Sequence, residues 1–307
     1  MSVSMKHILN QGPVLAGLGR TIFAGLKNKV LGNDGDLQVP GDVIEDVYDP
    51  RPRDLIDDYV EHVGGDPGEY RETLPPHLFP QWGFALAPQT LTDLPYPISR
   101  AMNGGCRMEV NEPLPVDEEL HVTAQLVDVD DNGSRAVLQQ KIVTSTPSVS
   151  EGIVAHLFVV IPLGGESTNE AEDEQELDPA DRKKRIERVP SDAKEVARWN
   201  IPDSAGLDFA KLTGDFNPLH WIPPYAKMGG FPNVILHGFS TMARAYEGLN
   251  QEAFQGRRDI DVFDVQFKKP LVLPAEVGLY MDDSNGVFVG DAPSGPCYMS
   301  GYYETSQ

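Results

Sequence analysis

Residues 209–226 read FAKLTGDFNPLHWIPPYA, the stretch of the chain from which both its fold class and its chemistry can be predicted. A helix is expected to end here, because Gly214 permits a backbone turn that other residues resist and Pro218 stiffens the loop that follows. Asp215 and His220 then lie five residues apart on one constrained loop. A carboxylate and an imidazole held in this way can share one water molecule in acid–base chemistry.

Asn217 lies between these two residues and can orient either of them by hydrogen bonds. Asp and Asn are also common turn formers in loops rich in Gly and Pro, so the short motif alone leaves a purely structural role open. Residues 209–226 as a whole resemble the hydratase-2 motif of the MaoC-like, R-specific enoyl-CoA hydratase family at every motif position. The resemblance implies catalytic roles for Asp215 and His220 and a supporting role for Asn217. It also implies an α+β hot-dog fold, in which an antiparallel sheet wraps around a central helix.

Residues 232–238, PNVILHG, resemble the family segment that enters the central helix. Addition of water to an enoyl thioester builds negative charge on the carbonyl oxygen. Backbone N–H groups at a helix N-terminus can stabilise that charge, and we assign this task to the Gly238 N–H. The alternative is that Gly238 only lets the helix pack against the sheet. His237 is expected to border the substrate pocket.

The two halves of the chain align with each other, which predicts a tandem, or double, hot-dog fold. Tyr59 and Gly64 align with Phe209 and Gly214 at an offset of 150. After the next loop the offset becomes 157, and the aligned positions are Leu74-Pro75 with Phe231-Pro232, Pro113-Leu114 with Pro270-Leu271, and Glu119 with Glu276. Surface loops absorb insertions at low cost, which explains the change of offset.

The first copy departs from the motif, and we expect it to be catalytically inactive. In the alignment, Asp215, His220 and Gly238 are replaced by Gly65, Tyr70 and Gln81. The family resemblance suggests that such a copy makes room for a long acyl chain. The residues expected to line this tunnel are Leu78, Phe79, Trp82, Phe84 and Leu86, although packing in an ordinary core is the commoner role for such side chains.

Periodicity predicts helices and strands in the same order in both halves. Helices are expected at residues 53–63, 81–91, within 192–212 and at 238–249. Strands are expected at residues 106–110, 120–128, 136–144, 154–161, 262–267, 276–280, 286–289 and 298–303. The predicted parts of the chain are an N-terminal arm (1–40), a degenerate hot-dog domain that holds the acyl-chain pocket (41–165), an acidic linker (166–188) and a catalytic hot-dog domain (189–307).

The charge of the chain is strongly negative, with 25 Lys and Arg against 47 Asp and Glu, a net charge of −22. Such a surface repels phosphate backbones, so no nucleic-acid partner is expected. The phosphates of a thioester carrier would need a local basic pair, and two candidates are Lys268-Lys269 and Arg257-Arg258. Solvated surface charge is the alternative for either pair.

The chain has two cysteines, Cys106 and Cys297, and no CxxC or HExxH motif, so no metal site is expected. No stretch approaches the length of a transmembrane helix and no convincing signal peptide is present, so we predict a cytoplasmic protein without a membrane span. No cofactor is expected beyond the coenzyme A or acyl-carrier protein that forms part of the substrate. Pairing of two chains into a homodimer remains open.

The predicted function is R-specific hydration of trans-2-enoyl thioesters, or the reverse dehydration of (3R)-hydroxyacyl thioesters. Two other functions compete with it: a hot-dog thioesterase and a non-catalytic protein that binds acyl thioesters. The intact acidic and imidazole loop of the second half favours the hydro-lyase, and the sequence leaves the chain length and the carrier open.

Overall fold

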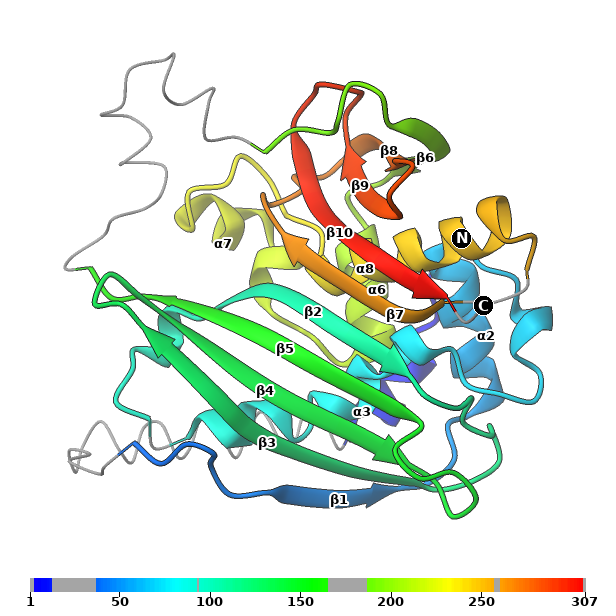
Figure 1. Ribbon diagram of the computed structural model, residues 1–307, viewed down its shortest axis with the longest axis vertical. Coiled ribbons are helices and arrows are strands. Elements are labelled where there is room, and N and C mark those ends of the chain that lie inside the picture. Colours follow the sequence, from blue (N-terminus) through cyan, green and yellow to red (C-terminus); the bar gives the residue numbers. More distant parts are fainter. Residues whose placement is uncertain (1–2, 13–36, 93, 165–186, 257–259, 306–307) are drawn as a thin grey trace.

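The computed structural model describes residues 3–12, 37–92, 94–164, 187–256 and 260–305. Within these residues ten strands form one continuous antiparallel sheet, in the order β1-β3-β4-β5-β2-β7-β10-β9-β8-β6 (Figure 1). The first half contributes β1 (Ile44–Tyr48), β2 (Met102–Val110), β3 (Leu120–Asp131), β4 (Arg135–Ser145) and β5 (Ile153–Pro162). The second half contributes β6 (Lys194–Ile201), β7 (Ile260–Phe267), β8 (Ala275–Met281), β9 (Gly286–Gly290) and β10 (Cys297–Thr305).

The strand order shows the duplication directly. Each half uses its five strands in the same sequence, and the halves join where β2 pairs with β7 and Cys106 lies opposite Val265. The predicted double hot-dog architecture is confirmed. It takes the form of one shared sheet, because the innermost strands of the two halves pair with each other.

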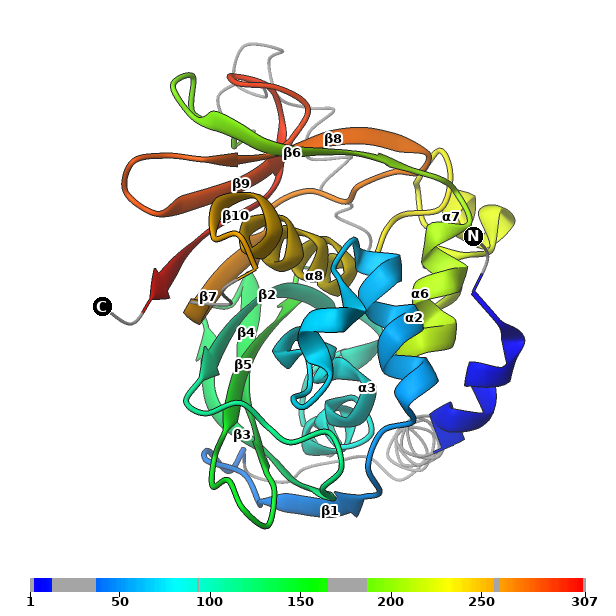
Figure 2. The ribbon, with the colours of Figure 1, turned by 90° about the vertical axis from the view of Figure 1, so that its right-hand side faces the viewer.

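Two corresponding helices, α2 (Arg53–Val63) and α6 (Ala205–Thr213), lie side by side between the halves (Figure 2). Each ends in a glycine with a left-handed backbone, Gly64 at φ 92° and Gly214 at φ 84°. Because this conformation strongly favours glycine, both helices stop at the aligned position.

The central helix of the second half is α8 (Gly238–Gly248), which lies against the concave face of its sheet (Figure 2). Phe239, Met242 and Tyr246 are buried, a spacing that places one apolar face of the helix in the core. A π-helical turn (Leu249–Ala253) continues it.

The predicted helix over residues 81–91 is wrong. The structure has a single turn, α3 (Pro80–Gly83), and a separate 3-10 turn (Ala87–Leu91). Pro88 lies in the second turn and lacks the N–H that a continuous helix would use. The sheet of the first half therefore wraps around short turns instead of a full-length helix.

Two edge strands were missed by periodicity. The helical stretch expected within residues 192–212 is α6, but the strand that precedes it there, β6 (Lys194–Ile201), was not predicted, nor was β1 (Ile44–Tyr48), its counterpart in the first half. Both strands are largely exposed, with few buried residues. A solvated edge strand lacks the alternation of apolar and polar residues from which strands are predicted.

The alignment of the two halves also needs a correction around the helix starts. Leu74 N donates to Leu114 O at 2.8 Å, and Leu236 N donates to Leu271 O at 2.8 Å. These equivalent bonds match Leu74 with Leu236, an offset of 162, where the sequence suggested 157. Pro76, not Gln81, therefore occupies the position of Gly238.

The described part of the predicted N-terminal arm is folded onto α6. A 3-10 helix (Met5–Gln11) places Gln11 Nε2 at 2.9 Å from Lys211 O and 3.0 Å from Leu212 O. Residues 13–36 of the arm and nearly all of the acidic linker (166–188) lie outside the described residues. Among the helices that are described, none has the length and hydropathy needed to cross a membrane.

Candidate active site

The loop after α6 holds Asp215 by short-range backbone contacts. Asn217 N donates to Asp215 Oδ1 at 3.3 Å, and Asn217 Oδ1 accepts from Leu219 N at 3.2 Å to cap the 3-10 turn Pro218–His220. Asn217 was expected to orient its neighbours through its amide side chain. In the structure that side chain is exposed and caps a turn, so Asn217 orients Asp215 through its backbone N–H.

His220 is oriented by a backbone carbonyl. Its Nδ1 lies 2.8 Å from Ile235 O, and because a carbonyl only accepts, Nδ1 carries the hydrogen. In the neutral ring, Nε2 is therefore left with a free lone pair. A Cβ atom on Gly206 would lie 1.9 Å from His220 O, so this glycine allows the His220 turn to lie directly on α6.

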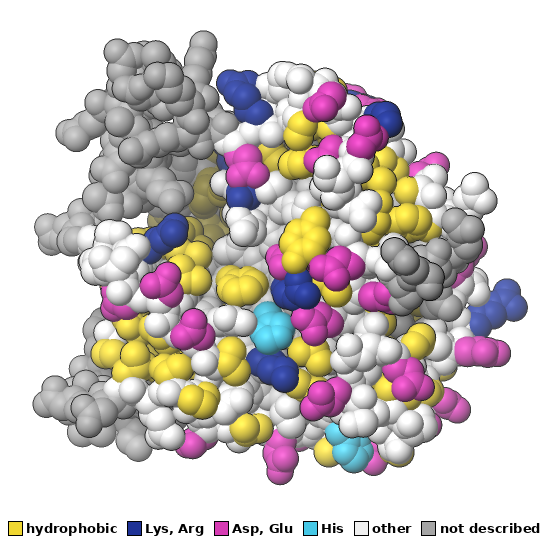
Figure 3. All heavy atoms as spheres, in the orientation of Figure 1, with side chains coloured by type: hydrophobic (Ala, Val, Ile, Leu, Met, Phe, Trp, Pro, Cys, Tyr) yellow, Lys and Arg dark blue, Asp and Glu magenta, His cyan; other side chains and the backbone are white. Residues whose placement is uncertain are grey.

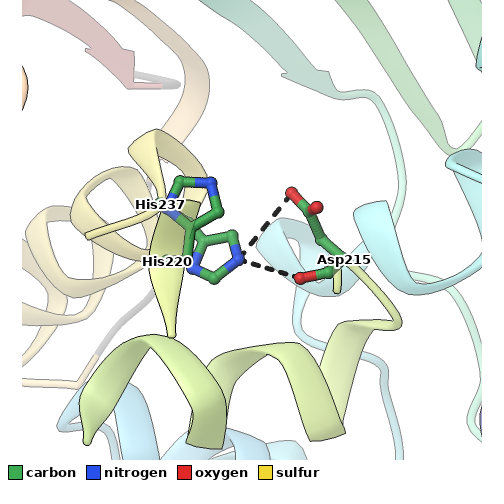
Figure 4. A group of neighbouring side chains, drawn as sticks. All are labelled: Asp215, His220 and His237. Atoms are coloured by element: carbon green, nitrogen blue, oxygen red, sulfur yellow. Dashed lines mark hydrogen bonds and ion pairs between the residues drawn. The ribbon is translucent and has the colours of Figure 1, made fainter. Parts of the chain in front are cut away.

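The imidazole rings of His237 and His220 stack, with centroids 3.6 Å apart and planes 25° apart (Figure 4). His237 Nε2 donates to Asp215 O at 3.0 Å and lies 3.8 Å from Asp215 Oδ2. Burial, assisted by the neighbouring His220, lowers the pKa of His237 to about 3, so the ring is neutral at ordinary pH. His237 was expected to border the substrate pocket, and this stays a prediction. Its side chain is 2% exposed and holds the catalytic loop through the hydrogen bond to Asp215 O.

Potential ligand atoms of Asp215, His220 and His237 lie within 4.8 Å of one another, close enough for one small group to contact all three. The Nε2 atom of His237 is already committed to Asp215 O. The two groups of this cluster that can still contact a ligand are then the Asp215 carboxylate and His220 Nε2. A catalytic zinc ion requires three protein ligands, so this arrangement suits a water molecule better than zinc.

Gly238 is the first residue of α8, and its N–H has no acceptor among the described residues. The first N–H groups of a helix lack partners within the helix and carry its positive dipole end. A Cβ on Gly238 would lie 2.8 Å from Cδ2 and Cε2 of Phe267. Both roles considered for this glycine are therefore compatible: it permits close packing on Phe267, and it offers a free donor beside the catalytic loop.

Phe79 and Trp82 are buried in the main core. Phe79 packs edge-to-face on Phe239, at a centroid distance of 5.9 Å, and Phe239 directly follows Gly238. Trp82 Nε1 donates to Thr144 Oγ1 at 2.9 Å. Their place in an acyl-chain pocket remains a prediction. It is supported by the contact of Phe79 with Phe239, the residue that follows Gly238 at the proposed thioester site.

The basic pair Lys268-Lys269 offers less charge than the sequence suggests. Lys268 Nζ lies 2.8 Å from Glu187 Oε2 and 2.6 Å from Gln266 Oε1, whereas Lys269 is exposed. Arg257-Arg258 lies outside the described residues. Figure 3 shows acidic and basic side chains interspersed on the outer face of the sheet, without a broad basic patch on that face.

The corresponding position in the first half holds a buried polar cluster that the sequence did not reveal. Glu247 Oε1 accepts from Tyr70 Oη at 2.6 Å and lies 2.7 Å from His77 Nε2. A Cβ on Gly65 would lie 2.5 Å from the Glu247 carboxyl carbon, so the Glu247 carboxylate occupies the space that an aspartate side chain would need. Pro76, which replaces Gly238, has no N–H to donate. This half therefore lacks both the acid–base loop and the amide donor.

Comparisons with known proteins agree with this geometry. Residues 183–290 match the family model of the MaoC-like domain. The chain is 38% identical over 78 residues to 3-hydroxyacyl-thioester dehydratase X of Mycobacterium tuberculosis, covering 25% of this chain and 26% of that protein. It is 27% identical over 162 residues to the peroxisomal enoyl-CoA hydratase 2 of Arabidopsis thaliana, covering 51% of this chain and 52% of that protein. The chain thus spans about a quarter and about half of these two relatives.

Solved structures match over a larger share of the chain. The crystal structure of HtdX of Mycobacterium tuberculosis has a TM-score of 0.66 at 19% identity and covers 86% of this chain and all of that one. A second protein of that organism, described as a double hot-dog fold, has a TM-score of 0.51 at 12% identity and covers 88% of this chain and 97% of that one. The motif, the paired sheets and the family match agree: residues 183–290 match the MaoC-like domain, and the chain has a double hot-dog fold.

Proposed function

We propose that the protein is a hydro-lyase, which adds water to trans-2-enoyl thioesters to form (3R)-hydroxyacyl thioesters or catalyses the reverse dehydration. The observation that carries the proposal is the cluster of Asp215, His220 and His237, the last of which directly precedes Gly238 and its free N–H at the start of α8. Hydratases and dehydratases among the relatives support the same reaction type. Neither a thioesterase nor a non-catalytic binding protein needs an intact loop of this kind in only one half.

The proposed reaction begins with a water molecule held by the Asp215 carboxylate and His220 Nε2. As the water oxygen attacks the β-carbon, one of its protons passes to this pair, with Asp215 as the favoured base. Neutral His220 carries its hydrogen on Nδ1, so Nε2 must first receive a proton before it can donate one. In this scheme Asp215 takes a proton from the water and passes it to His220 Nε2, which delivers it to the α-carbon, so that one water is added across the double bond and both side chains return to their starting states.

Gly238 has a separate task in this scheme. Negative charge develops on the thioester oxygen during attack, and the first N–H of α8 can stabilise it together with the helix dipole. Removal of one such donor typically costs about 100- to 1,000-fold in kcat. The close packing of Phe267 against Gly238 fixes where this donor lies.

The carrier is proposed to be coenzyme A or an acyl-carrier protein, with no further cofactor. A cytoplasmic location and a homodimer remain predictions, and one relative named above is peroxisomal.

The test is an absorbance assay of enoyl thioesters of several lengths on each carrier, with the stereochemistry of the product determined. Asp215→Asn and His220→Ala should each lower kcat by roughly 100-fold or more while the protein stays folded, because each removes a group that handles a proton. Asp203→Asn and His121→Ala replace exposed residues of the same types and should leave kcat unchanged. Near-normal turnover by either loop variant would refute the assignment, and a product of the opposite hand would refute the predicted stereochemistry.

A further inference from the structure

Arg244 lies within α8, six residues after Gly238. At the rise of an α-helix this separation is about 9 Å along the axis. His237, Ser240 and Arg244 follow one another at spacings of three and four residues, so they share one face of the helix. That face begins at the candidate active site and faces α2, where His62 meets Arg244.

The guanidinium of Arg244 lacks an acidic partner. Its Nη2 lies 3.4 Å from Nε2 of His62, and its buried Nε has no acceptor among the described residues. Lys211 provides the contrast, because this buried cation has Asp208 Oδ1 at 2.8 Å. A buried cation without an ion-pair partner is costly. The nearest buried carboxylate along α8 is Glu247, three residues farther on, and it is committed to Tyr70 and His77; among the described residues it forms no ion pair with Arg244.

The neighbours of Arg244 leave its positive charge uncancelled. Burial and the adjacent Arg244 lower the pKa of His62 to about 3, so this ring is neutral and accepts a hydrogen bond from the guanidinium. Burial lowers the pKa of Arg244 only to about 10, and the side chain stays charged at neutral pH. The buried Ser240 Oγ, also without a partner among the described residues, adds a second polar group on the same face.

We propose that Arg244 binds a carboxylate carried by the acyl chain of the substrate, so that the protein prefers enoyl thioesters with an anionic acyl end. This inference rests on the proposed function. Arg244 pairs naturally with a planar carboxylate through two parallel hydrogen bonds. Its side chain leans back toward the helix N-terminus and hence toward the proposed thioester oxygen at Gly238.

Such a substrate could offer Arg244 either a carboxylate on the acyl chain or a phosphate of the carrier, and the two differ in their distance from the thioester. A carboxylate at the end of a medium-length acyl chain lies within about 9 Å of the thioester, the separation that the helix rise gives for Arg244. The phosphate of a pantetheine arm lies much farther from the sulfur. The acyl end is therefore the better match.

The experiment compares the trans-2-enoyl-CoA thioesters of a medium-chain diacid and of the monoacid of equal length. Wild-type protein should favour the diacid thioester in kcat/KM by roughly 10- to 100-fold, the effect of one charge-assisted hydrogen-bonded pair. Arg244→Met should remove this preference and keep turnover of the monoacid thioester. Lys194→Met removes an exposed cation on β6 instead and should keep the preference, which controls for the general charge of the protein.

Two further measurements make the test decisive. The unliganded Arg244→Met variant should unfold at an equal or higher temperature than wild type, because it removes an uncompensated charge. Thioesters of N-acetylcysteamine, which lack phosphate, should show the same preference for the diacid and the same loss in the variant. Absence of a diacid preference in wild type, or its survival in Arg244→Met, overturns the proposal. A loss in the variant that is confined to coenzyme A thioesters also overturns it, in favour of phosphate binding. Failure to hydrate any thioester would instead refute the proposed function.

Discussion

Substitution of Gly238 by alanine tests both the packing and the chemistry of the helix start. The added methyl group would lie 2.8 Å from Cδ2 and Cε2 of Phe267 and 2.9 Å from Cγ. The Phe267 ring is held by its edge-to-face contact with Phe239, at 5.6 Å, so it cannot simply rotate away. Overpacking of this kind costs about 1–3 kcal/mol of unfolding free energy.

The same displacement would move the N–H proposed to stabilise the thioester oxygen. Loss of one such donor lowers kcat by about 100- to 1,000-fold, so Gly238→Ala should show a large fall in kcat with a modest loss of stability. The assays are turnover of an enoyl thioester and urea unfolding of the same preparations.

The matched control is Gly12→Ala, where a Cβ would meet nothing within 4 Å. This variant should keep both wild-type properties. The double variant Gly238→Ala, Phe267→Leu should recover stability, because the smaller side chain relieves the contact. Wild-type kcat in Gly238→Ala alone would refute the reasoning, since the predicted contact would then have moved neither the helix nor its donor.

Two predictions concern the buried polar residues between the halves. His62 has a pKa of about 3 when folded and 6.5 ordinarily, so the unfolded state binds more protons between these values. As pH drops through this window, His62 should lower the free energy of unfolding by about 1.4 kcal/mol per pH unit, and His237, whose folded pKa is also about 3, should add a similar fall. His62→Asn should make the fall in unfolding free energy less steep, as measured by urea unfolding at pH 7.5 and 5.0. His121→Gln, at an exposed site, should leave the fall unchanged. Equal slopes in all three proteins would contradict the assignment. Glu247→Leu should cost about 3–5 kcal/mol, because it leaves Tyr70 and His77 without their shared acceptor, whereas Glu247→Gln keeps an acceptor oxygen and should cost less. Equal urea midpoints for these two variants would show that the carboxylate is not the anchor of the cluster.

Local sequence predicted the elements whose conformation is set by nearby residues. The loop around Asp215 could be placed because Gly214 ends the helix and Pro218 limits the turn, both within a few residues. The two glycine-ended helices and the shared order of elements along the two halves followed from periodicity and internal alignment, whereas the two edge strands did not. The interrupted helix near Pro88 was misjudged because apolar residues continue through the break, and a buried apolar run does not reveal where the backbone changes direction.

Contacts between segments that lie far apart along the chain could not be predicted from the sequence. The correct match of Pro76 with Gly238 depends on backbone hydrogen bonds from Leu74 to Leu114 and from Leu236 to Leu271, whose acceptors lie in loops far along the chain. Glu247 reaches Tyr70 and His77 across more than 160 residues, and Arg244 meets His62 across a similar separation.

The sequence by itself determined that an acid and an imidazole share one bent loop, that a glycine opens the helix beside them, and that a second, altered copy precedes them. Only the tertiary structure decided what surrounds these groups: the carbonyl that orients His220, the buried His237 that stacks on it, and the arginine farther along α8 that lacks an acidic partner among the described residues. The physical reason is the range of the forces. Turn and helix preferences act over a few neighbouring residues, whereas burial and charge pairing depend on which distant side chains the fold brings into contact.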